Sequence, residues 1–426
     1  MERISTSESA MKSVLRFSAA GARGEAVNCP PRDWHEFTQC AMEHNVLPLV
    51  ACALLNSSDM SCPETLKEYI LNAMRYMSAS NLVRRQRVLG LISELQKAGF
   101  RIQVLKGYAI AGYYVYPECR DSVDVDLLID RNQEKEIYLY LENMGFKVTP
   151  RSKTSHQGVC QHSKYGVVEI HAHLYDELVE DVWFRGMNEN NYQEEMPVEL
   201  VIDGYTTQTL GYTDQLIFLT LHMIKHFIGS GLTIRMMLDV ALFCAYNSKK
   251  IDFTRFWSTV ETLQYATLVR CIWSMFVKYG NFAQSDFPEI GEVDSTLMEQ
   301  ILQDLECGGY MGSKELKERQ DASMEYNRRV LVKEKPYPLY LLYMMKWKLR
   351  SAWSHMFPGK AYLIKTFPFV EDAPALIPFM SVYQAIEYSL RKLCSGVLAR
   401  QIRSERSSVT NVSQRRIELF EELGML

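Results

Sequence analysis

RDSVDVDLLID, residues 120–130, places Asp124 and Asp126 one residue apart at the start of an apolar run. If this stretch is a strand, its side chains alternate between two faces, so the two aspartates point the same way while Val125 and Leu127 point into a core. Two carboxylates that stand side by side repel one another unless a positive group neutralises them. The stretch therefore predicts a strand with paired acids on one face and a charged partner for them.

The length and amino-acid composition are those of an ordinary soluble globular protein. The chain has 426 residues, enough for two or three domains, with 47% hydrophobic and 23% charged residues. Its formal net charge of -4 excludes a protein that is basic over its whole surface, as a non-specific nucleic-acid binder would be. A local basic patch is compatible with this charge.

Cysteine usage and the apolar stretches point to the cytoplasm. The ten cysteines include no C-x-x-C pair, so we expect reduced, mostly buried thiols and no zinc site. The N-terminal stretch MERISTSESAMKSVLRFSAAG lacks the continuous apolar segment of a secretory signal. The most apolar later stretch, DAPALIPFMSVYQAIEYSL, contains two prolines and Glu387, which argues against a membrane span. We expect a cytoplasmic protein with no membrane partner.

The periodicity of apolar residues divides the chain into three regions. Residues 1–100 show helical spacing, with an interruption near Pro48 and a glycine stop at Gly99. In residues 101–210, short β-type runs such as RIQVLKG and VDVDLLI alternate with helical stretches. Helical spacing returns over residues 211–426. We therefore predict an α+β domain flanked by helical N- and C-terminal regions.

Paired aspartates on one strand, with a third carboxylate on a neighbouring strand, form a natural cage for Mg²⁺. This ion prefers oxygen ligands and is usually bound by a few carboxylates together with substrate phosphates. Glu169, Asp176 and Asp239 compete for the third position. Alternation in VVEIHA turns Glu169 away from its apolar neighbours, whereas Asp176 follows in a turn and Asp239 has a partner four residues away in Arg235. We therefore expect Glu169, although an Asp-x-Asp pattern alone is more often a solvated strand end.

A second feature precedes the acids. VLKG, residues 104–107, reads as a strand, a lysine, a glycine and the start of a helix. Gly107 lets the backbone approach a phosphate, the first N–H groups of the helix are free to bind one, and Lys106 adds a positive charge. Such a pattern alone is more often a simple turn, but beside the acids it predicts a phosphate-binding turn.

These motifs together resemble the uncharacterised nucleotidyltransferases of the DNA polymerase β-like superfamily. VLKGYAIAGYYVYPECRDSVDVDLLI has the order of the family's first two motifs: a lysine-glycine turn, a short helix ending near tyrosine-proline, an arginine, and Asp-x-Asp before an apolar strand. VVEIHAHLYD and LTLHMIKHFIGSGLTIRMMLDVALF resemble its later motifs. The likeness covers roughly residues 32–395 and is most specific over residues 104–129.

The resemblance implies a polymerase β-like fold, in which a small mixed sheet carries the metal acids and helices flank it. It implies a Mg²⁺-dependent enzyme, with Mn²⁺ as the alternative ion, that transfers an NMP group from ATP or another NTP to an acceptor and releases pyrophosphate. Carried over by position, Asp124, Asp126 and Glu169 are the catalytic and metal-binding residues of a catalytic domain at residues 101–210. The acceptor is open between a small molecule, a tRNA and a protein, and the oligomeric state is open too.

By the same resemblance, Lys106, Gly107 and Arg120 bind the nucleotide. Arg120 either leans over the triphosphate or pairs with Asp121. The superfamily's commoner first motif is Gly-Gly or Gly-Ser, so the serine that would touch the triphosphate is missing, and Val123 stands where relatives often have a small residue. The missing serine keeps a rival open: a non-catalytic protein on the same fold that senses a nucleotide or a partner. A hydrolase that uses the same acids on a phosphoester is a second rival.

Four histidines near these motifs can be interpreted either as structural or as functional residues. His222 and His226 share a helix face as zinc ligands would, but the glutamate that a zinc protease carries after the first histidine is a methionine here. A polar helix face turned toward the acceptor, or a buried pair, suits them better. His171 and His173 alternate with Glu169, so one of them could support the metal cage, and ordinary structural hydrogen bonding is the alternative.

Overall fold

The computed structural model describes residues 8–58, 60–122, 124–151, 156–174, 195–308, 310–334, 376–394 and 411–426. Two of the positions discussed above, Val123 and Asp176, lie outside the described residues. The chain divides into two compact units. The first consists of Met1–Tyr326 together with Arg415–Leu426, and the second of Asn327–Gln414.

Helices make up the N-terminal region, as the apolar spacing predicts. They are α1 (Ala10–Arg23), α2 (Trp34–Glu43), α3 (Leu47–Asn56) and the long α4 (Glu64–Lys97). Side-chain oxygens of Ser9 and Asp33 cap the first turns of α1 and α2. Pro48 lies in the first turn of α3, which explains the interruption in the periodicity. The backbones of α1 and α3 meet at Gly21, where any Cβ would overlap the carbonyl group of Leu49.

The middle of the chain forms a seven-stranded mixed sheet in the order β3-β4-β5-β2-β1-β7-β6. The strands are β1 (Ile102–Val104), β2 (Asp124–Ile129), β3 (Lys147–Thr149), β4 (Gln157–His162), β5 (Gly166–His171), β6 (Val198–Ile202) and β7 (Tyr205–Thr209). The short helices among them are α5 (Tyr108–Ala111), η1 (Pro117–Cys119), η2 (Arg131–Gln133) and α6 (Glu134–Asn143). β2 is central, parallel to β5 and antiparallel to β1. The predicted α+β class is confirmed.

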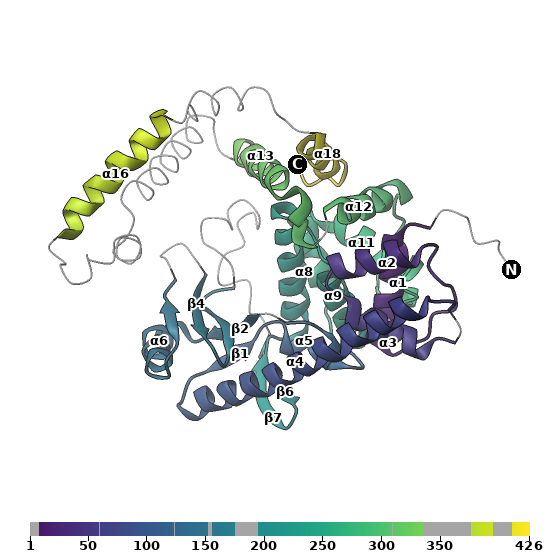
Figure 1. Ribbon diagram of the computed structural model, residues 1–426, viewed down its shortest axis with the longest axis horizontal. Helices are drawn as coiled ribbons and strands as arrows, with labels where there is room; N and C mark the ends of the chain where they lie inside the picture. Colours follow the sequence, from purple (N-terminus) through teal and green to yellow (C-terminus); the bar gives the residue numbers. More distant parts are fainter. Residues whose placement is uncertain are drawn as a thin grey trace. The chain divides into compact units, whose positions relative to one another are not determined.

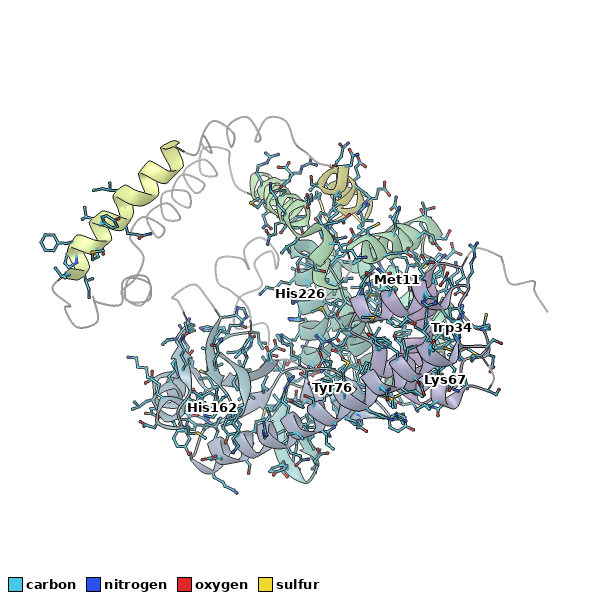
Figure 2. The ribbon with its side chains drawn as sticks, in the orientation of Figure 1. Met11, Trp34, Lys67, Tyr76, His162 and His226 are labelled. Atoms are coloured by element: carbon cyan, nitrogen blue, oxygen red, sulfur yellow. The ribbon has the colours of Figure 1, made fainter. Side chains whose placement is uncertain are left out.

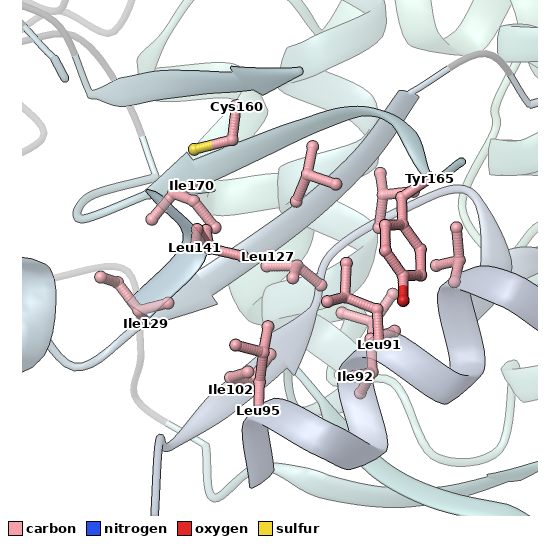
Figure 3. Close-up of a cluster of buried hydrophobic side chains, with 14 of the residues drawn as sticks. Leu91, Ile92, Leu95, Ile102, Leu127, Ile129, Leu141, Cys160, Tyr165 and Ile170 are labelled. Atoms are coloured by element: carbon pink, nitrogen blue, oxygen red, sulfur yellow. The ribbon is translucent and has the colours of Figure 1, made fainter. Parts of the chain in front are cut away.

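The core of this part lies between one face of the sheet and the long helix α4. Figure 3 shows leucine and isoleucine side chains of α4 packed against Leu127 and Ile129 of β2. Val125 is buried in the same cluster. Because side chains alternate along a strand, Asp124 and Asp126 turn to the opposite face, away from α4. Burial of one face of β2 thus fixes the direction of both acids.

Helical structure returns after β7. The helices are α8 (Tyr212–Gly229), α9 (Ile234–Asn247), α10 (Phe253–Thr262), α11 (Ala266–Lys278), η4 (Gln284–Asp286), α12 (Ser295–Gly308), η5 (Tyr310–Glu315), α13 (Leu316–Glu334), α16 (Ile377–Cys394) and α18 (Asn411–Glu422). In Figure 1, α8 and α9 stand side by side next to the sheet. No described helix is long and apolar enough to cross a membrane. The division into domains at residues 100 and 210 stays a prediction.

Residues 415–426 join the first unit through a buried cluster of charges. Arg319 and Arg416 both donate hydrogen bonds to the carboxylate of Asp304 on α12. Arg416 also donates to the backbone carbonyl of Phe227 on α8. The three charged side chains are buried. Through this cluster, α8 is held by a residue 189 positions further along the chain.

Candidate active site

Three carboxylates gather on the face of the sheet that α4 leaves free. Asp124 and Asp126 alternate on β2, and the register of β2 against β5 sets Asp126 directly beside Glu169. Asp126 is buried, with 2% of its surface exposed, whereas Asp124 and Glu169 are half-buried. The strand pairing therefore brings together the three acids that the sequence singled out.

His171, two residues after Glu169 on β5, points to the same acids. Its Nε2 lies 3.0 Å from Oδ1 of Asp126 and 3.8 Å from Oε2 of Glu169. Since an ionised carboxylate only accepts hydrogen bonds, Nε2 carries a hydrogen and donates a hydrogen bond to Asp126. Burial alone would lower the pKa of His171, but its hydrogen bond to Asp126 and its contact with Glu169 outweigh burial and raise it. In this arrangement His171 orients Asp126.

Lys106 is the principal neutralising partner of the acids. Its Nζ lies 3.0 Å from Oδ1 of Asp126. Burial would lower the pKa of Lys106, but the negative charges of Asp126, Asp124 and Glu169 outweigh burial and raise it. Burial would conversely raise the pKa of Asp126, but Lys106 and the hydrogen bond from His171 hold it below its usual value. Asp126 is therefore ionised beside the cation of Lys106.

Gly107 forms the turn next to this lysine, and Ser122 lies against it. Gly107 has a φ of 62°, in the region that favours glycine, and a Cβ there would lie 3.0 Å from Oγ of Ser122. α5, which follows, has only four residues, so the turn offers little of the helix end that the sequence suggested. Ser122 donates from Oγ to the backbone oxygen of Asp124 at 3.2 Å. The sequence reading missed Ser122, although it stands two residues before Asp124.

Arg120 is held by Asp239 of α9. Its Nε and Nη2 donate to the two carboxylate oxygens at 2.8 and 2.6 Å, and Tyr114 donates to the same carboxylate at 2.7 Å. Burial would lower the pKa of Arg120, but Asp239 raises it above its usual value. The pairing of Asp239 with Arg235 suggested by their helical spacing is not what forms. A buried, bidentate guanidinium competes better for one carboxylate than a neighbour on the same helix does.

His222 and His226 of α8 stand across from the acids as neutral side chains. Nζ of Lys106 lies 2.9 Å from Nε2 of His222, and the ammonium group must be the donor. The two imidazole rings are 4.6 Å apart. Burial, followed by the charge of Lys106, lowers the pKa of His222 well below its usual value and that of His226 to about 3. Neither ring is a cation at neutral pH.

A cavity of about 260 Å³ lies between the sheet and the helices α8 and α9. Its lining includes five of the six predicted site residues: Lys106, Gly107, Arg120, Asp124 and Asp126. Glu169 is not part of the lining and acts from beside Asp126.

Arg235 also lines the cavity, and its Nε is buried with no hydrogen-bond partner among the described residues. The cavity therefore offers Asp124 and Asp126 on the sheet side and a guanidinium group with an unpaired N–H on the helix side.

The donor set fits a divalent cation. One atom each of Asp126, Glu169 and His171 lies within 4.8 Å of the others, and Asp124 projects from the same strand face. Hard ions such as Mg²⁺ prefer carboxylate oxygens, which the three acids supply. The imidazole already donates to Asp126, so it fits a supporting role better than direct ligation.

Comparison with known proteins gives one family match. A family model described as "Uncharacterised nucleotidyltransferase" matches residues 30–279, more than half of the chain. No curated protein matches the chain. Among solved structures, that of the antibiotic-resistance factor ANT(2'')-Ia is 12% identical with a TM-score of 0.32, covering 43% of this chain and 96% of its own. A tRNA-processing enzyme in an apo form is 13% identical with a TM-score of 0.22, covering 80% of this chain and 96% of its own.

Proposed function

The chain belongs to the family of uncharacterised nucleotidyltransferases, and from this membership we propose that it transfers an NMP group from an NTP to an acceptor, with release of pyrophosphate. The observation that carries the proposal is the cavity in which Asp124 and Asp126 face Lys106 and Arg235. Phosphoryl transfer needs little covalent chemistry from the protein. It depends on positioning and on neutralising the charge of the phosphates.

Asp124, Asp126 and Glu169 would hold Mg²⁺, or Mn²⁺ in its place. A divalent ion supplies charge stabilisation for the attacked phosphorus and for the leaving pyrophosphate. The protein's part is to keep the three carboxylates aligned. His171 does this for Asp126 by a hydrogen bond of 3.0 Å, and the β2–β5 pairing does it for Glu169.

Lys106, Arg235 and the turn at Gly107 would bind the triphosphate. Both cations line the same cavity as the aspartates, so phosphates bound there would meet positive charge beside the metal. Arg120 belongs to the nucleotide-binding set through the cavity that it lines. Its bidentate bond to Asp239 gives it a fixed position, which suits contact with a bound nucleotide better than large movement.

The acceptor hydroxyl or phosphate would approach from α8. His226 has a pKa of about 3, too far below neutrality for an efficient general base. Its neutral ring can accept a hydrogen bond and orient an acceptor hydroxyl. The proton of that hydroxyl is better taken by a carboxylate of the site.

The test is incubation of the purified protein with each of four labelled NTPs, Mg²⁺ and a cell extract as the source of acceptors. A transferase releases pyrophosphate and adds nucleotide mass to a component of the extract. Binding of an NTP with no pyrophosphate release under any condition would instead identify a sensor. Release of inorganic phosphate from phosphoesters without nucleotide addition would identify a hydrolase.

A further inference from the structure

A second hollow lies outside the candidate active site, between α4 and the turn that joins β4 to β5. Its volume is about 500 Å³, which lies within the range of ligand pockets. Figure 2 shows the two elements, with Tyr76 labelled on α4 and His162 labelled at the end of β4. The charged members of the lining are Arg84 and Arg87 of α4 and Lys164 of the turn, and we call this site the α4 hollow.

The charge of the α4 hollow is positive and uncompensated. None of the described residues that line it is acidic. Arg84 donates to the backbone oxygen of Ser122 at 2.5 Å, Arg87 to that of Lys164 at 3.4 Å, and Lys164 to the hydroxyl of Tyr165 at 3.1 Å. These partners are neutral, so the contacts fix the cations in place and leave their charges free for a ligand. No ion pair joins any of the three to a described acid.

The sequence of α4 concentrates this charge. Between Glu68 and Glu94 the helix contains four arginines and no acidic residue, in a chain whose net charge is -4. One of them, Arg85, points elsewhere and pairs with Asp203 at 2.7 Å. The arginines on either side of Arg85 in the sequence, at positions 84 and 87, reach the hollow instead. This is a local basic patch on a protein that is acidic overall.

The hollow also presents an aromatic surface. The side chain of Tyr76 is exposed, at 79%, and that of Val83 at 50%. An exposed ring beside fixed cations is the arrangement that binds single-stranded nucleic acid, because bases stack on the ring while cations contact the phosphates. A small metabolite would be better served by an enclosed pocket than by a ring that stands in solvent.

The α4 hollow adjoins the strand that carries the metal acids. Gly166 of its lining begins β5, and the next residue, Val167, pairs with Asp124. Paired strands lie about 4.8 Å apart. Arg84 makes the second connection, since the carbonyl it binds belongs to Ser122, which lines the active-site cavity. The acids face away from α4, so a strand bound in the hollow would have to pass around the start of β2 and β5 to bring its end to them.

We propose that the α4 hollow binds the sugar-phosphate backbone and one or two bases of a single-stranded nucleic acid, and that such a strand is the acceptor. The assignment as acceptor rests on the proposed nucleotidyl transfer, whereas the binding itself does not. Transfer to this acceptor breaks the bond between the α- and β-phosphates of the NTP. A new phosphodiester bond forms between the α-phosphate and a hydroxyl of the strand, and pyrophosphate leaves. The proton of that hydroxyl goes to a carboxylate of the active site.

The binding test is fluorescence anisotropy of a labelled twelve-nucleotide oligouridylate, without NTP or metal, over a range of salt concentrations. The double variant R87E/K164E should weaken binding at least tenfold. Each neutralised phosphate contact changes the slope of log K against log salt by about 0.7, so loss of two should lower the slope by about 1.4. Tyr76→Ala should weaken binding about tenfold through lost stacking.

Lys67→Ala is the matched control, because it removes a charge from α4 nine residues from Tyr76, about 14 Å along the helix, and outside the hollow. It should bind as the wild type does. Wild-type affinity in the double variant overturns the proposal. So does inorganic phosphate or polyglutamate that displaces the oligonucleotide at equal concentration of charge, since either result describes a site for anions in general.

A second measurement separates this inference from the proposed function. Asp124→Asn should bind the oligonucleotide normally while losing pyrophosphate release. If the wild type binds the strand and no NTP yields pyrophosphate, the transfer proposal fails and the binding site stands. If pyrophosphate is released with another acceptor and R87E/K164E leaves that activity unchanged, the strand is not the acceptor.

Discussion

The ammonium nitrogen of Lys106 and the side chain of His171 meet at a single oxygen, Oδ1 of Asp126, each at 3.0 Å. One buried carboxylate thus carries the charge balance of the sheet side of the site. Asp124, on the same strand, makes no such ion pair among the described residues. Asp126 therefore contributes to the stability of the fold and Asp124 does not contribute in this way, although we propose that both bind the metal ion.

The first prediction separates stability from metal binding. Asp124→Asn should abolish transfer with less than about 1 kcal/mol lost from the free energy of unfolding, because it removes a half-buried charge near other acids. Asp126→Asn should abolish transfer and also cost about 3 kcal/mol, because it leaves the half-buried Lys106 cation without its partner. Pyrophosphate release and urea unfolding measure the two effects. Full activity in either folded variant contradicts the metal assignment.

The second prediction concerns the triphosphate. Lys106→Ala should weaken NTP binding by about 1 to 3 kcal/mol, the scale of a charge-assisted hydrogen bond. Arg235→Ala should act in the same direction, since its guanidinium lines the cavity. Lys97→Ala, in the last turn of α4, is the control. Isothermal titration with a non-hydrolysable NTP gives the dissociation constants, and unchanged values would return both side chains to structural roles.

The third prediction identifies the third acid. Glu169→Gln should lose transfer and metal-dependent nucleotide binding together, because Glu169 is the cross-strand neighbour of Asp126. Chelation of divalent ions should have the same effect on the wild type. Glu199→Gln, on the exposed side of β6, should change neither property. Nucleotide binding that stays metal-dependent in Glu169→Gln would move the third ligand to another acid.

The fourth prediction tests the bond that joins the segment between η1 and β2 to α9. Asp239→Asn should cost about 3 to 5 kcal/mol of stability, because Arg120 would remain buried and unpaired. Arg235→Ala should cost far less, since Asp239 is paired elsewhere. Thermal unfolding of the two variants side by side decides between Arg120 and Arg235 as the partner of Asp239. Equal losses would contradict the observed pairing.

The fifth prediction is a pH dependence of stability that involves His44. Burial, assisted by Lys314 and opposed by Glu43, lowers the pKa of His44 to about 4. The unfolded chain, with a pKa of about 6.5, takes up a proton first as the pH falls, so stability is complete above pH 6.5 and declines toward pH 4. The wild type should lose about 1 to 2 kcal/mol more than His44→Gln between pH 7 and 5. Urea unfolding at the two pH values measures this, and an equal loss of unfolding free energy in the two proteins would contradict the prediction.

The part of the site that lies along one strand could be predicted from the sequence, for a physical reason. Alternation has a period of two, so apolar Val125 and Leu127 on one face oblige Asp124 and Asp126 to share the other. The same rule placed Glu169. Periodicity also located the change from helices to strands and back.

Contacts between distant segments could not be predicted in this way. Arg120 and Asp239 are 119 residues apart, and local spacing favoured a neighbour of Asp239 on its own helix. Nothing in the sequence near Lys106 indicates that it meets His222 of α8. Such pairings follow from how helices pack on the sheet, which the pattern of apolar residues constrains only loosely.

The bond from Arg416 to the backbone of Phe227 sets an order of events during synthesis. Phe227 follows His226 directly, so this contact steadies the helix that forms one wall of the cavity. The ribosome must add 189 further residues before the partner of Phe227 exists. The sheet with its acids can form long before that contact exists, because all of its strands precede α8 in the sequence. In a nascent chain, the three acids would thus come together on the sheet well before the cavity beside them is complete.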